Sequence, residues 1–448
     1  MTEITVLTPT GSLGYGFDVE AFNRAMGMGP HVIAVDSGST DPGPHYLGSG
    51  QPLVPRISIK KELTTMIVAG VGAGIPVVVG SAGGGGTNTH VDWMADIVRE
   101  IAAEKGLRFK LARIYADIPI ERAKQALRDG EVQRFEASFD LTEDLLDETV
   151  ALVGQMGHEP ISEALRQGAD VVIAGRAVDD CAISAFPIWK GADEAQAVHM
   201  GKILECGALA ADPGGMDVMV GRVADDHFVV EPGSTGRRAT TRSIAAHSLY
   251  ERENPFEQAG PGHALDLHDC RFEQSDDRSV KVSGAKIAHG EDYWIKLEGA
   301  RIAGYRAICI AGVRCPTMIE RIDDILDDVR REALDYFQDN SLKIEFHVYG
   351  RDAVMRGMEP EKQIAAHELG VVVDCVADDQ DVAHAASHHA SGEMLHYAYP
   401  GWYNTAGNLA FPYSPSDLKA GPVYVFSAYH LMKVRDPLEL FPILLEEL

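Results

Sequence analysis

Residues 76–90 read PVVVGSAGGGGTNTH, an apolar run of valines followed by small residues and four consecutive glycines. A short apolar run bounded by glycine is typical of a buried strand. The amphipathic stretch 90–105 that comes next predicts a helix. Residues 76–105 are therefore expected to form a strand, a glycine-rich loop and a helix, which is the repeating unit of a parallel α/β sheet.

The same alternation runs through the first 180 residues. It predicts strands at residues 4–8, 31–36, 76–81, 109–115 and 171–175. Helices are expected at residues 18–28, 57–72, 90–105, 119–129, 142–156 and 160–167. Alternation of this kind indicates an α/β fold with a doubly wound, mostly parallel sheet and right-handed crossovers. We expect residues 1–230 to form this domain, which carries the glycine-rich and acidic loops.

A long helix is expected at residues 192–211, followed by an irregular stretch that ends near residue 261. In the second half of the chain, residues 231–448, the order of elements changes. Short strands at 264–272, 279–287 and 293–298 suggest a meander. The later elements are strands at 303–313, 343–349, 370–377 and 423–433, with helices at 317–337 and 381–397. This order predicts an α+β domain with the ferredoxin-like βαββαβ arrangement.

The formal net charge of the 448-residue chain is −27. Such a charge repels phosphate backbones and anionic membranes, so neither a nucleic-acid partner nor a membrane partner is expected. The N-terminus lacks a signal-peptide pattern, and no apolar run approaches the roughly 18 residues that cross a bilayer. The six cysteines show no regular spacing, which is typical of reduced thiols. These features predict a cytoplasmic protein, which we expect to be a homo-oligomer.

Ligands of open parallel sheets bind beyond the carboxyl ends of the strands, so the loops there are candidate sites. The four glycines could present backbone N–H groups to a phosphate or carboxylate, or they could form only a tight turn. His90, at the start of the next helix, is a candidate catalyst or a capping group. Candidate substrate-binding residues in these loops are Ser12, Ser39, Thr40, Gly83, Gly84, Gly85 and Gly86.

Arg176, Asp179 and Asp180 follow the strand at 171–175. A guanidinium beside carboxylates can hold an anionic substrate and provide an acid or base. The two carboxylates could instead hold a divalent cation together with Asp36 or Asp41, or form a structural salt bridge. Cys181 could line the same site, although a buried, unreactive thiol is the simpler interpretation.

A pair of histidines four residues apart, His384 and His388, lies on the predicted helix 381–397. This spacing can present two metal ligands on one helix face. No HExxH pattern or third ligand accompanies them, so a solvated or packed face is the expected role.

Several of these loops resemble the acyclic terpene utilisation (AtuA) family. The resemblance rests on residues 36–44, 80–86, 116–119, 173–180 and 203–208. It extends to about residue 230, and the C-terminal part looks like a more divergent relative of that family's second half. The family takes its name from a pathway that degrades terpenes through branched acyl-CoA esters, and the resemblance implies a lyase or hydratase step. Since this chain looks like a shorter member, the resemblance supports the location of the site rather than a terpenoid substrate.

Taken together, these residues favour a lyase of the hydratase/dehydratase type. Its substrate would be a small carboxylate or the CoA thioester of one, with Asp36, Asp179 and Asp180 transferring protons and Arg176 anchoring the anion. A metal-dependent hydrolase of a small carboxylate or amide is one alternative, and a non-catalytic small-molecule binding protein is another. A divalent metal is the one cofactor that the carboxylates suggest.

Overall fold

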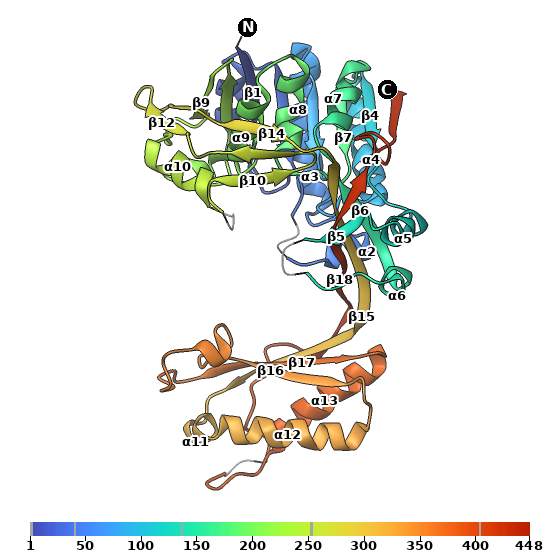
Figure 1. Ribbon diagram of the computed structural model, residues 1–448. Coiled ribbons are helices and arrows are strands. Elements are labelled where there is room, and N and C mark those ends of the chain that lie inside the picture. Colours follow the sequence, from blue (N-terminus) through green and yellow to red (C-terminus); the bar gives the residue numbers. More distant parts are fainter. Residues whose placement is uncertain (1–2, 40–41, 136–137, 251–253, 403–404) are drawn as a thin grey trace. The chain divides into compact units, whose positions relative to one another are not determined.

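The computed structural model describes residues 3–39, 42–135, 138–250, 254–402 and 405–448. The chain divides into two compact units. Unit 1 comprises Met1–Arg301 and Phe426–Leu448, and unit 2 comprises Ile302–Val425. The sequence suggested a division after residue 230, whereas the last 23 residues return to the first unit. Figure 1 shows this return, with the red C-terminal strand beside the blue and cyan elements of unit 1.

Five parallel strands form the centre of a ten-stranded sheet in unit 1. Their order is β1-β2-β3-β7-β4, and each neighbouring pair is parallel. The strands are β1 (Ile4–Thr8), β2 (Val32–Asp36), β3 (Val77–Gly80), β4 (Lys110–Ile114) and β7 (Val171–Ala174). All five strands predicted in the first 180 residues are therefore confirmed, as is the α/β class.

Antiparallel strands extend this sheet at both edges. β8 (Met219–Val223) pairs with β1, followed outward by β9 (His227–Pro232), β13 (Val280–Ser283) and β12 (Arg271–Gln274). At the other edge β19 (Ile443–Glu447) pairs antiparallel with β4. The chain therefore covers the two open edges of the parallel core with strands that lie far away in sequence.

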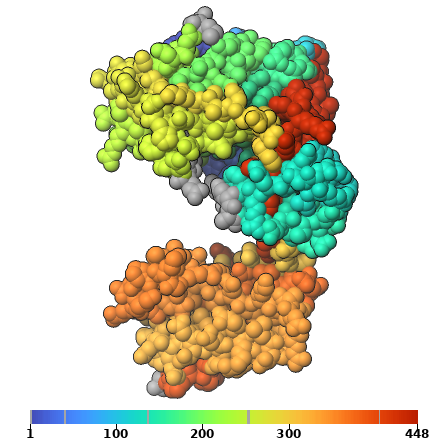
Figure 2. All heavy atoms as spheres, in the orientation of Figure 1, coloured from blue at the N-terminus to red at the C-terminus, as the bar shows by residue number. Residues whose placement is uncertain are grey.

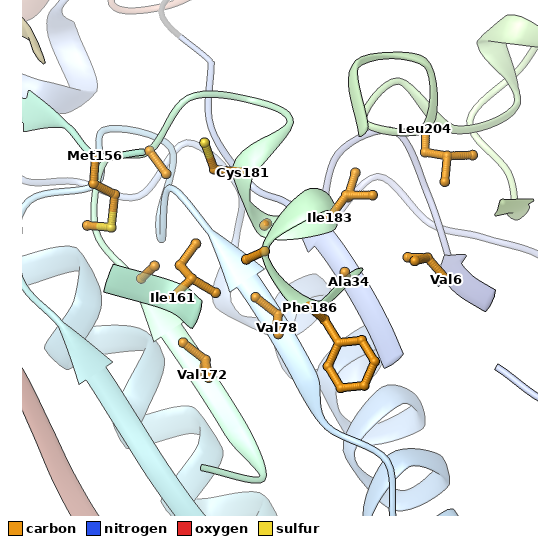
Figure 3. Close-up of a cluster of buried hydrophobic side chains, with 14 of the residues drawn as sticks. Val6, Ala34, Val78, Met156, Ile161, Val172, Cys181, Ile183, Phe186 and Leu204 are labelled. Atoms are coloured by element: carbon orange, nitrogen blue, oxygen red, sulfur yellow. The ribbon is translucent and has the colours of Figure 1, made fainter. Parts of the chain in front are cut away.

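Helices cover both faces of the parallel core. Because successive side chains of a strand point to opposite faces, Val32 and Ala34 belong to one core cluster and Ile33 and Val35 to the other. The first cluster packs against α5 (Ile120–Arg128), α7 (Glu159–Arg166), α8 (Cys181–Trp189) and α9 (Glu194–Leu204), and part of it is shown in Figure 3. The second packs against α1 (Val19–Met26), α3 (Arg56–Ala73) and α4 (Asn88–Lys105).

A small three-stranded sheet of β10 (Glu257–Gly260), β11 (His263–Asp266) and β14 (Lys286–His289) packs on α9. Leu265 and Leu267 meet Ala195 and Val198 of this helix. The yellow residues of this sheet lie at the surface of unit 1 in Figure 2. The predicted meander is wrong, because β11 and β14 belong to this sheet whereas β12 and β13 join the edge of the large one. Hydrophobic pattern specifies strands but not their partners.

Two predicted helices are also wrong in extent. Residues 142–156 form α6 (Glu143–Asp147) followed by strand β6 (Thr149–Gln155), which pairs antiparallel with residues 296–301. The apolar, partly β-branched run TVALV suits a strand once a partner is present. The helix expected at 192–211 ends at Leu204, and a 3₁₀ turn (Gly207–Ala210) follows.

Unit 2 contains helices α12 (Ile322–Phe337) and α13 (Gln380–His396) and strands β16 (Lys343–Tyr349) and β17 (Leu369–Ala377). They lie between two long strands, β15 (Tyr293–Val313) and β18 (Asp417–Val434), which continue into unit 1. The element order β15-α12-β16-β17-α13-β18 matches the predicted order, although two predicted strands, 293–298 and 303–313, are one. The remaining short elements are α2 (His45–Ser49), β5 (Val132–Arg134), α10 (Thr241–Leu249), α11 (Pro316–Glu320) and a second 3₁₀ turn (Arg356–Met358).

Helix α3 offers a test of its packing on the sheet. A Cβ atom at Gly70 would lie 2.5 Å from Cγ2 of Val77 in β3, whereas a Cβ at Gly72 meets nothing within 4 Å. We expect Gly70→Ala to lower the free energy of unfolding by about 1–2 kcal/mol through overpacking. Gly72→Ala should raise it by about 0.5–1 kcal/mol, since alanine favours helix. Urea denaturation of both variants measures the difference, and equal effects would contradict this packing.

Candidate functional site

The candidate site lies at the carboxyl ends of three neighbouring strands of the parallel core. Asp36 is the last residue of β2, Ser81 follows β3, and Arg176 comes two residues after β7. Asp36 is 4% exposed and Arg176 3% exposed, so both charged groups are buried. Gly38 permits this approach, because a Cβ there would lie 2.4 Å from Cβ of Ser81 and 2.7 Å from Nη1 of Arg176. The structure therefore brings together the ends of β2, β3 and β7, as the sequence predicted.

The guanidinium of Arg176 is occupied by protein partners. Its Nε donates to Oε2 of Glu298 at 2.8 Å and its Nη2 to Oε1 at 3.4 Å, while Nη1 donates to the hydroxyl of Ser81 at 3.4 Å. Glu298 lies on β15 and is 1% exposed. Burial alone would raise the pKa of Glu298, but Arg176 and Lys296 outweigh burial and hold the pKa below its usual range. Arg176 is thus a buried, ion-paired residue rather than an open anchor.

Asp36 is a buried carboxyl with one oxygen in use. Its Oδ2 accepts from the backbone N–H of Gly38 at 2.8 Å, whereas Oδ1 has no hydrogen-bond partner among the described residues. Burial, and after it the negative charge of Asp179, raises the pKa of Asp36 to about 7, against the opposing effect of Arg176. A carboxyl in this state holds a proton near neutral pH and can transfer it.

Asp179 is more exposed than its neighbour Asp180, with 41% of its side chain accessible to solvent. Lys202 of α9 donates to Oδ2 of Asp179 at 3.1 Å and to Oε1 of Glu205 at 2.7 Å. Burial would raise the pKa of Asp179, but Lys202 and Arg176 outweigh it and lower the pKa. Burial raises the pKa of Glu205 to about 8. Neighbouring carboxyls are therefore in opposite protonation states near neutral pH.

Asp180 is the N-cap residue of helix α8, and Cys181 is the first residue of that helix. Asp180 accepts from the hydroxyl of Ser184 at 3.1 Å, and burial raises its pKa. Burial, followed by the nearby carboxylates, raises the pKa of the Cys181 thiol well above its ordinary value. A thiol in this environment stays protonated, so Cys181 fits the expected unreactive role.

The glycine loop is buried and closely packed. The N–H groups of Gly84 and Gly86 donate to the carbonyls of Ser81 and Ala82 at 3.1 and 3.0 Å. Gly86 has φ +66°, and a Cβ there would lie 2.3 Å from the backbone nitrogen of Arg176. Since glycine is required for this approach, one function of the loop is to place the backbone of Arg176.

His90 lies on another side of the glycine loop. Its ring is within 3.0 Å of the positions that Cβ atoms would take at Gly83 and Gly85, and its Nε2 is 3.0 Å from the carbonyl of Gln51. Because the carbonyl accepts, Nε2 carries the proton, and Nδ1 has no partner within the described ranges. Burial lowers the pKa of His90. A neutral histidine packed under the loop results.

The remaining predicted residues lie in three places. Ser12 follows Gly11, whose Cβ would lie 2.3 Å from the carbonyl oxygen of Cys206, so its loop adjoins the end of α9. Ser39 follows Gly38, whereas Thr40 and Asp41 lie outside the described residues. In unit 2, His388 is 3.0 Å from Asp417, and its side chain is largely exposed.

A cavity of about 430 Å³ opens beside the Arg176–Glu298 ion pair in unit 1. Its wall includes Gln155, whose Nε2 donates to Oε1 of Glu298 at 3.3 Å. Lys296 is also in the wall, and its Nζ is 3.0 Å from the same oxygen. The six lining residues most relevant to ligand chemistry are Phe135, Val178, His263, Trp294, Lys296 and Leu431.

Four charged residues of the site were missed in the sequence. Lys296 and Glu298 come from a predicted strand and share one face by their i, i+2 spacing, but nothing in the sequence pairs that strand with β6. Lys202 and Glu205 lie three residues apart at the end of α9. The motif 203–208, which carried part of the resemblance, contains Glu205 and was the one available signal.

The family model of the acyclic terpene utilisation family protein AtuA matches residues 58–414. The chain belongs to the AtuA family. In this AtuA family member Arg176, Asp179 and Glu298 lie inside the matched region, while Asp36 precedes it. No curated protein and no solved structure matches the chain.

The described residues contain no helix that is both long and apolar enough to cross a membrane. They also contain no group of three or more His, Cys, Asp or Glu side chains arranged to hold a metal ion.

The protonation of Asp36 can be tested through stability. Its pKa rises from 3.8 to about 7 on folding, so the folded protein keeps a proton that the unfolded chain releases between about pH 4 and 7. This contribution is complete below about pH 4 and is lost as the pH rises through 7. The difference in melting temperature between Asp36→Asn and wild type should therefore favour the variant more at pH 8 than at pH 5.

Asp276 provides the control for this experiment. Hydrogen bonds from the backbone of Arg278 and the side chain of Ser279 lower its pKa, so it is ionised throughout pH 5–8. The effect of Asp276→Asn should stay constant over this range. The same pH trend in both variants would argue against a protonated Asp36.

The buried ion pair gives a second prediction. Glu298→Gln leaves the Arg176 charge without its carboxylate and should lower the free energy of unfolding by about 3–5 kcal/mol. The exposed pair of Arg56 and Glu100, 2.7 Å apart, is the control. Glu100→Gln should cost less than about 1 kcal/mol. Denaturant unfolding of both variants measures the contrast. Similar losses in the free energy of unfolding would show that the buried Arg176–Glu298 pair stabilises the protein no more than an exposed pair does.

Proposed function

We propose that this protein is a lyase of the hydratase/dehydratase type that acts on a small carboxylate or its CoA thioester. The observation that carries the proposal is the pair of carboxyls beside Arg176. Asp36 is buried with one unpartnered oxygen among the described residues, while Asp179 is partly exposed and held by Lys202. Two titratable groups whose environments drive their pKa values apart are typical of an acid and base pair.

Elimination of water assigns one role to each carboxyl. The Asp179 carboxylate takes a proton from the carbon next to the substrate carbonyl, and the electron pair of that C–H bond forms the double bond. The C–O bond to the neighbouring hydroxyl breaks, and Asp36 gives its proton to the departing oxygen, which leaves as water. Solvent then returns a proton to Asp36 and removes one from Asp179. Hydration follows the same steps in reverse.

The remaining groups would support this chemistry through charge and position. Arg176 and Lys202 stabilise the ionised Asp179. Asp180 is buried beside them, and burial keeps it protonated to higher pH than usual. The positive charges of Arg176 and Lys202 would also stabilise the negative charge that develops on the substrate carbonyl oxygen as the proton is removed. A metal-dependent hydrolase and a non-catalytic binding protein are the competing functions, and the experiment below separates them.

Two finer features of the protein remain part of the proposal. Unit 2 is proposed to be ferredoxin-like, supported by the element order βαββαβ and the strand order β16-β17-β15-β18. The cytoplasmic location stays a prediction from the sequence.

Variants of the two carboxyls test the function directly. A panel of hydroxy acids and their CoA thioesters is screened for formation of a carbon–carbon double bond. With a substrate so found, Asp179→Asn should lower kcat by about a hundredfold or more and leave KM within roughly tenfold, because proton transfer acts in the transition state. Asp36→Asn should lower kcat similarly and remove a pH dependence of the rate near pH 7.

Other outcomes identify the competing functions. Full activity of both variants would contradict the proposed acid and base. Loss of activity on chelation and recovery with added divalent metal would favour the hydrolase. Binding without turnover on the whole panel would favour the non-catalytic alternative.

A further inference from the structure

The cavity next to the site has one cation in its wall. Of the described residues that line it, Lys296 is the one lysine or arginine. The two other basic side chains in the lining are the imidazoles of His263 and His289, and Nε2 of His289 is 3.1 Å from Oε2 of Glu194. The acidic lining residue, Asp292, pairs with Lys433 at 2.5 Å. Lys296 is therefore the fixed positive charge that a ligand in the cavity would meet.

Lys296 is held in place from several directions. Its Nζ is 3.0 Å from Oε1 of Glu298 and donates to the hydroxyl of Tyr429 at 2.8 Å. The ammonium also lies over the rings of Tyr429 and Phe135, at 4.1 and 5.1 Å from their centroids. Its side chain is 15% exposed. An ammonium carries three hydrogens, so two polar partners leave it able to donate to a ligand in an already fixed position.

The local charge balance favours an anion although the whole chain is strongly acidic. Arg176, Lys202 and Lys296 are three cations, and the carboxylates ionised beside them are Glu298 and Asp179. Burial raises the pKa of Asp36 to about 7 and that of Glu205 to about 8, so both carboxyls are partly protonated near neutral pH. Since Arg176 is already paired and buried, Lys296 is the cation of this group that lines the cavity.

The rest of the cavity wall determines what kind of anion fits. Phe135, Val178, Trp294 and Leu431 present aromatic and aliphatic surface. Alanine and glycine residues from β10, β11 and β14 also line the cavity, and its polar lining residues besides Lys296 are Gln133, Gln155, His263, His289 and Asp292. Pockets of this type bind molecules whose body is apolar and whose few polar groups meet fixed partners. Hydroxyls of a sugar acid or other polyhydroxy acid that face this aromatic and aliphatic surface would be left unpaired.

We propose that Lys296 binds the carboxylate of a ligand whose apolar body fills this cavity. This names the substrate class of the proposed lyase and rests on that function for its catalytic meaning. The sequence favoured Arg176 as the residue that binds the anion, and this proposal assigns that role to Lys296 on β15 instead. Lys296 thereby becomes a specificity-determining residue that selects a compact, apolar monocarboxylate.

Octanoate and its uncharged counterpart 1-octanol serve as probes, with binding measured by titration calorimetry and by intrinsic tryptophan fluorescence, to which Trp294 in the cavity wall contributes. We expect Lys296→Met to weaken octanoate binding by about tenfold or more, because a charge-assisted hydrogen bond is lost. The affinity for 1-octanol should change less than about twofold. Lys296→Arg should retain most of the octanoate affinity, and gluconate should not bind.

Matched variants separate the anchor from the cavity. Ala264→Phe fills the cavity from an exposed position on β11 and should weaken both probes. Ala103→Phe, on the exposed side of α4, and Lys343→Met, on β16, are controls and should leave both unchanged. Thermal melting of each variant shows that it is folded.

Two results would overturn the inference. One is unchanged octanoate affinity in folded Lys296→Met, and the other is a wild-type protein that binds neither probe. Binding is measured without turnover, so it can fail or succeed independently of the lyase. If octanoate binding follows Lys296 but no hydroxy acid is converted, the proposed function fails and this site stands. If turnover depends on Asp179 but Lys296→Met leaves KM unchanged, the proposed function stands and this binding site fails.

Discussion

The buried ion pair of Arg176 and Glu298 is the interaction on which the candidate site depends. Arg176 follows β7 of the parallel core, and Glu298 lies on β15, more than a hundred residues later in the chain. Desolvation of two charges is costly, and the cost is recovered only when geometry and further hydrogen bonds are good. Ser81, Gln155 and Lys296 provide those contacts. The pair thus connects β15 to the end of the sheet and fixes the wall of the cavity.

The other charges near the site follow from this arrangement. With Arg176 committed to Glu298, its remaining influence on Asp36 and Asp179 is electrostatic. Burial raises the pKa of Asp36, whereas Lys202 and Arg176 together lower that of Asp179. Two identical side chains therefore differ in protonation near neutral pH because one is enclosed and the other faces cations. Such a difference is what acid–base chemistry requires.

The four glycines of the loop have a packing role in the fold, whereas anion binding by their N–H groups stays a prediction. The position of this loop after β3 was evident from the sequence, and anion binding by backbone N–H groups was the attractive interpretation. In the fold, Gly83 and Gly85 lie against His90, while Gly86 lies against the backbone of Arg176. Two of the N–H groups are used within the loop. The absence of side chains serves close packing, through which the loop positions a charged residue of the site.

The pattern of apolar runs and loops was enough to predict the parallel core and the strand ends where Asp36, Arg176 and Asp179 gather. This was possible because buried parallel strands are continuous apolar runs, and their loops meet at one edge. Folding was needed to show that residues 149–155 form a strand and that Lys296 and Glu298 complete the site. Strand formation there depends on pairing with residues 296–301, and pairing between distant segments leaves no local pattern. The pKa values of the carboxyls were likewise set by burial and by neighbours that folding alone brings together.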